Sequence, residues 1–127
     1  MKIVIIEDEQ LVADNLAKII LKVDSKIIIK AILYSIEEAI DWFRKNESPD
    51  LIFSDIQLGD GLSFEIFKTI NCNSPIIFCT AYDEYALKAF KVNGIDYILK
   101  PITIESIKET LNKYKLIVNS ISKTYLP

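Results

Sequence analysis

The sequence predicts an α/β domain in which a five-stranded parallel sheet carries helices on both faces. Two observations lead to this prediction: five short runs of apolar, β-branched residues recur along the chain, and segments with helical spacing lie between them. Parallel neighbours need crossover connections, which the helical segments supply. The chain has 127 residues, a length that suits one compact domain.

The predicted strands are apolar along most of their length, as expected of strands buried on both faces of a parallel sheet. Polar or turn residues bound each of them. The five runs are Ile3–Ile6, Ile27–Leu33, Leu51–Phe53, Ile76–Cys79 and Tyr97–Leu99. We expect the spatial order 2-1-3-4-5, counted along the chain, with the second strand at an edge.

Periodicity and capping residues predict the first three helices. Apolar residues recur at helical spacing from Val12 to Val23, which predicts the first helix. The second helix can begin with a capping box at Ser35-Ile36-Glu37-Glu38. The third would cover approximately Leu62–Asn71.

Two more helices follow the fourth and fifth strands. Asp83 can cap the fourth helix, and Gly94 suits its end. Thr103 can cap the fifth, whose periodicity runs to Val118. Because the periodicity fades from Asn119, we assign residues 1–118 to the domain and residues 119–127 to the start of a linker or a truncated C-terminal tail.

The charge and the apolar pattern argue against nucleic acids and membranes as direct partners of this chain. Its formal net charge is −3, and it has no stripe of basic side chains to neutralise a phosphate backbone. Glu7 and Asp8 end the N-terminal apolar run too early for a signal peptide, and no run reaches membrane-spanning length. We therefore expect a cytoplasmic protein.

The chain contains no histidine, which excludes imidazole metal sites and histidine-activated nucleophiles. It also excludes a phosphohistidine donor within this chain. The two cysteines, Cys72 and Cys79, are too few for a disulfide framework, and we expect them to fill the core.

Side chains with distinctive chemistry follow four of the predicted strands, where the carboxyl ends of a parallel sheet form sites. These residues are Glu7 and Asp8 after the first strand, Asp55 after the third, Thr80 after the fourth and Lys100 after the fifth. Neighbouring carboxylates repel one another unless a cation neutralises them, and Mg²⁺ prefers such oxygen ligands. Asp55 then has the place of a carboxylate nucleophile, with Thr80 and Lys100 as donors to incoming phosphoryl oxygens.

Each of these residues also has an ordinary interpretation when it is taken singly. An aspartate after a strand is often a helix N-cap, a threonine can simply end the strand, and a lysine can be a solvated charge. Four strand ends that carry these residue types in this order are hard to obtain from capping and solvation alone. The combination favours a magnesium-dependent site for phosphoryl transfer.

At these residues the chain resembles a known family, the receiver domain of two-component response regulators. The resemblance covers residues 1–118 and implies the flavodoxin-like (CheY-like) fold. The stretches at residues 55–67 and 80–90 are similar to the LytR/AlgR branch, whose members usually carry a LytTR DNA-binding domain after the receiver. The motifs are Ile5-Ile6-Glu7-Asp8-Glu9, Phe53-Ser54-Asp55-Ile56-Gln57-Leu58, Thr80-Ala81-Tyr82 and Tyr97-Ile98-Leu99-Lys100-Pro101.

The resemblance implies a set of metal ligands. Asp8, Asp55 and the main-chain carbonyl of Gln57 would bind Mg²⁺ directly, and Glu7 would act through water. Two positions depart from the usual family pattern. Glu7 replaces an aspartate, which changes the reach of that carboxylate, and Gly59 stands where proline is common, which would loosen the loop.

The resemblance also implies how the domain is phosphorylated and how it switches. Asp55 would be the phosphoacceptor, and Thr80 and Lys100 would contact the phosphoryl group. Thr80 and Tyr97 would form the switch, and the Lys100–Pro101 peptide bond would be cis, which proline permits at low energy. The alternatives are that Tyr97 is a half-buried strand aromatic and that Pro101 lies in an ordinary trans turn.

The predicted function is that of a phosphoacceptor domain, which takes a phosphoryl group from a sensor histidine kinase and changes its surface to control transcription. It would be a signalling switch that catalyses only self-phosphorylation and autodephosphorylation. By the resemblance, phosphorylation would favour a homodimer on the face of the fourth helix, fifth strand and fifth helix, where Tyr85, Leu87 and Phe90 add apolar groups. The alternative is that these three side chains lie in the core, which is the favoured position for Phe90. DNA would be bound by a LytTR domain, which does not follow Val118 here. We therefore expect the receiver half of a longer protein, with a single-domain regulator as the alternative.

Two other functions fit these residues less well. An aspartate-nucleophile phosphatase usually carries a second acid two residues after the nucleophile, a position that Gln57 occupies here without an acidic group to protonate a leaving group. A receiver-like interaction module that is never phosphorylated would not need the intact set of strand-end residues. Both are therefore less favoured than the phosphoacceptor domain.

Overall fold

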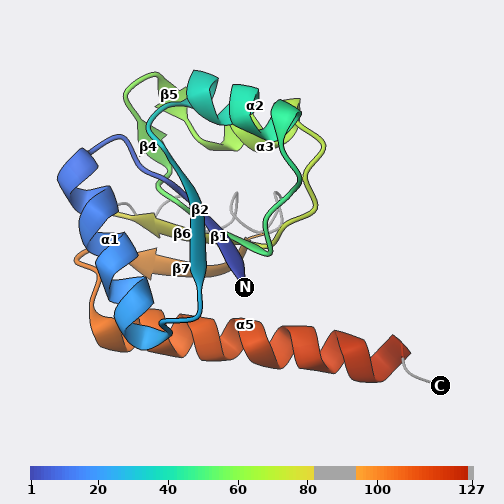
Figure 1. Cartoon of the computed structure of the whole chain (residues 1–127). Coiled ribbons are helices and arrows are strands. Elements are labelled where there is room, and N and C mark those ends of the chain that lie inside the picture. Colours follow the sequence, from blue (N-terminus) through green and yellow to red (C-terminus); the bar gives the residue numbers. More distant parts are fainter. Residues whose placement is uncertain (82–93, 126–127) are drawn as a thin grey trace.

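The structure is a computed structural model that describes residues 1–81 and 94–125, with side chains through residue 119. In the described residues, five parallel strands form one sheet in the order β2-β1-β3-β6-β7 (Figure 1). Because β6 and β7 are the fourth and fifth strands of this sheet along the chain, the predicted order 2-1-3-4-5 is confirmed. The strands are β1 (Lys2–Ile6), β2 (Ile28–Leu33), β3 (Leu51–Ser54), β6 (Ile76–Thr80) and β7 (Gly94–Leu99).

Helices cover both faces of the sheet, as predicted. α1 (Gln10–Val23) and α5 (Ile104–Tyr125) lie on one face, and α2 (Ile36–Lys45) and α3 (Phe64–Thr69) lie on the other (Figure 1). Within the described part of the chain, no helix has both the length and the apolar character needed to cross a membrane. The predicted fourth helix, with Asp83 at its start, lies outside the described residues.

The strands are apolar throughout because successive side chains enter two different cores. Ile3 and Ile5 of β1 pack toward α1 and α5, whereas Val4 and Ile6 pack toward α2 and α3. The central strands β3 and β6 divide their side chains between the two cores in the same way. The cysteines fill space as expected: Cys79 is buried in the first core, and Cys72 packs at the margin of the second.

The predicted caps of α2 and α5 are present. The Ser35 hydroxyl accepts a hydrogen bond from the Glu38 amide at 3.0 Å, but the Glu38 carboxylate accepts from the Tyr34 amide instead of completing the capping box. At α5, the Thr103 hydroxyl accepts from the Ser106 amide at 3.1 Å, and the Ser106 hydroxyl accepts from the Thr103 amide at 3.0 Å. Both helices therefore begin where their capping residues predict.

The structure differs from the sequence prediction between Asp55 and α3. A two-stranded antiparallel hairpin, β4 (Gln57–Leu58) and β5 (Gly61–Leu62), occupies the loop, so α3 begins at Phe64 rather than near Leu62. Two-residue strands are too short to show a periodic pattern, and the hairpin was therefore missed.

The ends of two other elements also differ. Gly94 is the first residue of β7, although we expected it to end the fourth helix. The helix α5 continues to Tyr125, through most of the segment that we assigned to a linker or tail (Figure 1). The part of a helix that extends past the sheet has no core to pack against. It needs no apolar stripe, so the helix can continue after its apolar periodicity has faded. The division of the chain at residue 118 remains a prediction.

Alanine substitution at the two glycines of the hairpin should change the free energy of unfolding in opposite directions. The φ angle of Gly59 lies outside the left-handed region and its added Cβ would have ordinary contacts, so Gly59→Ala should raise the free energy of unfolding by about 0.4–1 kcal/mol. Gly61 has φ +138°, and its Cβ would lie 3.2 Å from Cδ1 of Ile36, so Gly61→Ala should lower it by about 1–3 kcal/mol. Urea unfolding of both variants tests this, and equal effects would contradict it.

Candidate functional site

The five predicted strand-end residues meet at one edge of the sheet. Neighbouring strands β1, β3, β6 and β7 end beside one another in that order, so their carboxyl ends bring Glu7, Asp8, Asp55, Thr80 and Lys100 together. Main-chain hydrogen bonds between strand ends hold these residues in register. The Asp55 amide donates to the Ile6 carbonyl at 2.9 Å, and the Lys100 amide donates to the Thr80 carbonyl at 2.8 Å. The sheet topology therefore builds the site.

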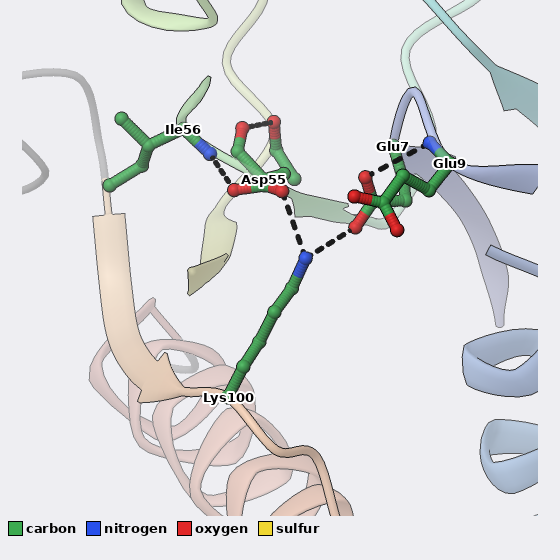
Figure 2. A network of polar contacts seen from close by, with 6 residues as sticks. Glu7, Glu9, Asp55, Ile56 and Lys100 are labelled. Atoms are coloured by element: carbon green, nitrogen blue, oxygen red, sulfur yellow. Dashed lines mark hydrogen bonds and ion pairs between the residues drawn. The ribbon is translucent and has the colours of Figure 1, made fainter. Parts of the chain in front are cut away.

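Lys100 lies between two carboxylates at the centre of this site (Figure 2). Its Nζ is 2.6 Å from Oε1 of Glu7 and 2.9 Å from Oδ2 of Asp55. The Glu7 side chain is only 4% exposed and that of Asp55 is 11% exposed, so these ion pairs are poorly screened by solvent. Lys100, which follows β7, thus links the residues that follow β1 and β3.

Both carboxylate oxygens of Asp55 have a hydrogen-bond donor. The amide of Ile56 donates to Oδ1 at 2.6 Å, and Lys100 donates to Oδ2 at 2.9 Å (Figure 2). These two bonds fix the orientation of the carboxylate toward the shared edge of β1, β3 and β7. The carboxylate therefore has little freedom to rotate.

The carboxylates of Glu7, Asp8 and Asp55 lie close together and affect the pKa values in the site. Burial raises the pKa of Glu7 to about 7, helped by the nearby charge of Asp55 and opposed by the hydrogen bond from Lys100. Burial would lower the pKa of Lys100, but its hydrogen bonds to Glu7 and Asp55 outweigh this and raise it. The site therefore keeps Lys100 charged and disfavours a further uncompensated negative charge.

The acidic residues fit a hard divalent cation. Oxygen atoms of Glu7, Asp8 and Asp55 lie within 4.8 Å of one another, a separation that one ion can bridge. Glu7 is buried and Asp8 is exposed, so the cluster is closed to solvent at Glu7 and accessible to it at Asp8. Gln57 begins β4 two residues after Asp55, and its main-chain carbonyl remains a predicted ligand.

The predicted switch residues lie on neighbouring strands. Thr80 is buried at the end of β6, and Tyr97 is half-buried on β7. Since Phe78 pairs with Tyr97 in the parallel register, Thr80 and Tyr97 project from the same face of the sheet. The predicted cis peptide bond between Lys100 and Pro101 is confirmed.

Two contributions to the site were not predicted from the sequence. The amide of Ile56 donates a hydrogen bond to the carboxylate of Asp55, and the carboxylate of Asp60 accepts hydrogen bonds from amides in the first turn of α2. The only local signal for the second is an acidic residue before a glycine in a turn, a pattern that does not reveal a partner 24 residues away.

Comparison with known proteins identifies the family. Residues 3–112 match the response regulator receiver domain. The sensory transduction protein LytT of Bacillus anthracis is 42% identical over 118 residues, which cover 91% of this chain and 47% of that protein. The positive alginate biosynthesis regulatory protein of Pseudomonas aeruginosa is 32% identical over 117 residues, covering 89% and 46%. The expected similarity to the LytR/AlgR branch is confirmed, and the chain spans about half the length of these relatives.

Solved structures agree on the fold. The response regulatory domain of protein mrkE from Klebsiella pneumoniae has a TM-score of 0.76 and 28% sequence identity, covering 97% of this chain and 99% of that one. The N-terminal domain of a response regulator/sensory box/GGDEF 3-domain protein from Carboxydothermus hydrogenoformans has a TM-score of 0.79 and 27% identity, covering 95% and 99%. Sequence, fold and strand-end residues agree, and the chain belongs to the response regulator receiver domain family.

Proposed function

We propose that Asp55 of this receiver domain accepts a phosphoryl group and that the resulting acyl phosphate is the signal the domain transmits. The observation that carries this proposal is that Asp55 belongs to a cluster of three carboxylates and also lies 2.9 Å from the ammonium group of Lys100. The carboxylates supply ligands for Mg²⁺, and Lys100 supplies a fixed positive charge. A phosphoryl group needs both kinds of neighbour.

In the proposed reaction, one carboxylate oxygen of Asp55 attacks phosphorus in line with the leaving group. A bond forms between that oxygen and phosphorus while the bond from phosphorus to the donor breaks, and the electron pair leaves with the donor. Lys100 stabilises the negative charge of the transferred group, and Thr80 donates a hydrogen bond to it. Mg²⁺, held by Asp8, Asp55 and the carbonyl of Gln57, with Glu7 acting through water, would supply further charge neutralisation.

We propose a sensor histidine kinase as the physiological donor, because the chain belongs to the response regulator receiver domain family and contains no histidine of its own. The phosphorylated domain would then shift Thr80 and Tyr97 and favour a homodimer through the face that includes β7 and α5. Leu99 and Ile104 on this face are 49% and 45% exposed, which supports an apolar contact there. The output would be transcription, controlled from the cytoplasm through a separate LytTR DNA-binding domain.

Phosphorylation can be tested with a small-molecule donor. After incubation with acetyl phosphate and Mg²⁺, intact mass spectrometry should detect one added phosphoryl group. EDTA should suppress this phosphorylation, because it removes the Mg²⁺ that Asp8 and Asp55 would bind. The Asp55→Asn variant should show no addition under the same conditions. Labelling of that variant to the wild-type level would show that Asp55 is not the acceptor.

A further inference from the structure

The carboxylate of Asp60 forms long-range hydrogen bonds with the first turn of α2. Its Oδ1 accepts from the Ile36 amide at 3.0 Å, and its Oδ2 accepts from the amides of Ile36 at 3.1 Å and Glu37 at 3.3 Å. The first amides of a helix have no partner within the helix, so they are free to bind a carboxylate from elsewhere. Ser35 binds only the next amide, that of Glu38. α2 is thus capped by two residues from different parts of the chain.

The position of Asp60 connects this cap to the phosphorylation site. Asp60 lies in the turn of the β4–β5 hairpin, which begins at Gln57, two residues after Asp55. Figure 1 shows the hairpin at the N-terminal end of α2. The hairpin also approaches the acidic cluster, since a Cβ on Gly59 would lie 3.7 Å from Oδ2 of Asp8. The hairpin therefore contacts the N-terminus of α2 and lies close to the proposed metal ligands.

Other contacts show that the hairpin packs closely on the start of α2. The backbone of Gly61 approaches Ile36 so closely that an added Cβ would lie 3.2 Å from its Cδ1. Hydrogen bonds from the amides of Ile36 and Glu37 lower the pKa of Asp60, because unpaired amides at a helix N-terminus favour a charged carboxylate. The interaction is thus charge-assisted and specific in direction.

We propose that Asp60 is a positioning residue: by fixing the β4–β5 hairpin to the N-terminus of α2, it holds Gln57 and Asp55 where metal binding and phosphoryl transfer require them. The inference rests on the proposed function, because it assigns Gln57 and Asp55 the roles given above. Groups that orient metal ligands from outside the coordination shell typically change metal affinity by about 10- to 100-fold when removed. An effect near the lower end is expected here, since the bonds lie at the surface.

Two alanine variants separate positioning from capping. Asp60→Ala and Ser35→Ala each remove one side-chain cap of α2, but only the first releases the hairpin. We expect Asp60→Ala to bind Mg²⁺ about tenfold more weakly, measured by NMR titration of the Ile56 and Gly59 amides, and to be phosphorylated by acetyl phosphate about tenfold more slowly at subsaturating Mg²⁺. Ser35→Ala should stay within about twofold of the wild type in both measurements, since its cap holds no ligand.

The Asp60→Asn variant tests rescue. An asparagine caps a helix about as well as aspartate, so its amide oxygen should restore Mg²⁺ affinity and phosphorylation to within about threefold of the wild type. Equal effects of Asp60→Ala and Ser35→Ala would reduce Asp60 to an ordinary cap and overturn the proposal. If the wild type binds Mg²⁺ but is never phosphorylated, the proposed function fails, and the Mg²⁺ titration alone decides whether Asp60 positions the ligands.

A measurement on the wild-type protein guards against variants that fail to fold. Coupling between two sites is reciprocal, so Mg²⁺ should in turn stabilise the bonds from Asp60 to α2. Saturating Mg²⁺ should therefore slow hydrogen exchange of the Ile36 and Glu37 amides by more than that of Arg44 and Lys45 at the other end of the same helix. Equal changes at both ends would contradict the proposed connection.

Discussion

The Lys100→Met variant should accept a phosphoryl group from acetyl phosphate about 100- to 1,000-fold more slowly than the wild type, the usual effect of removing one fixed donor from a reacting anion. Methionine keeps an unbranched side chain of similar length, so the change removes the positive charge with little loss of packing. In the wild type, the ammonium group is 2.9 Å from Asp55 and is only partly exposed. Its electrostatic effect is therefore weakly screened.

A second lysine provides the matched control for this experiment. Lys113 pairs with Asp96 at 3.7 Å on the surface of α5, where its side chain is 55% exposed. Lys113→Met should leave the phosphorylation rate within about twofold of the wild type, because exposed ion pairs contribute little. Rates are measured as the growth of the phosphorylated mass at fixed Mg²⁺. Equal rates for the Lys100 and Lys113 variants would exclude a role for Lys100 in the transfer.

The Phe78→Ala variant should lose about 3–5 kcal/mol of the free energy of unfolding. Phe78 is fully buried in β6, an interior strand that lies between β3 and β7. Its ring lies 5.3 Å from that of Phe64 and 6.2 Å from that of Phe67, so it anchors α3 to the sheet. Since small domains are stable by about 5–15 kcal/mol, this single cavity removes a large part of the total.

An exposed apolar residue is the control for the core variant. Leu116 on α5 is 70% exposed, so Leu116→Ala should change stability by no more than about 0.5 kcal/mol. Urea unfolding followed by circular dichroism measures both variants. A loss below about 1 kcal/mol for Phe78→Ala would mean that the core around α3 is packed far less tightly than the structure has it.

The sheet and the strand-end residues could be predicted because each depends on a local pattern. A continuous apolar run such as Ile76–Cys79 marks a strand with both faces buried, and the residue that follows it must emerge at the carboxyl edge. Parallel strands place all such residues on the same edge, so Glu7, Asp55 and Lys100 could be grouped before any contact was known. The capping residues Ser35 and Thr103 were predictable for the same reason, since a cap is a contact within four residues.

The contacts that connect distant segments could not be predicted in this way. The pairing of Lys100 with Glu7 joins residues 93 positions apart, and the binding of Asp60 to α2 depends on how the β4–β5 hairpin packs. The hairpin itself consists of two-residue strands without any period. The extension of α5 to Tyr125 was missed for a different reason, because a helix beyond the sheet needs no buried stripe.

Locating the modified residue shows whether Asp55 receives the phosphoryl group. Borohydride reduces an aspartyl phosphate to homoserine, and tandem mass spectrometry of peptides from the treated protein then identifies its position. We expect homoserine at position 55 and unchanged aspartate at positions 8 and 60, which lie in the loops at the same edge of the sheet. Homoserine at either of those positions, with Asp55 intact in the phosphorylated protein, would contradict it.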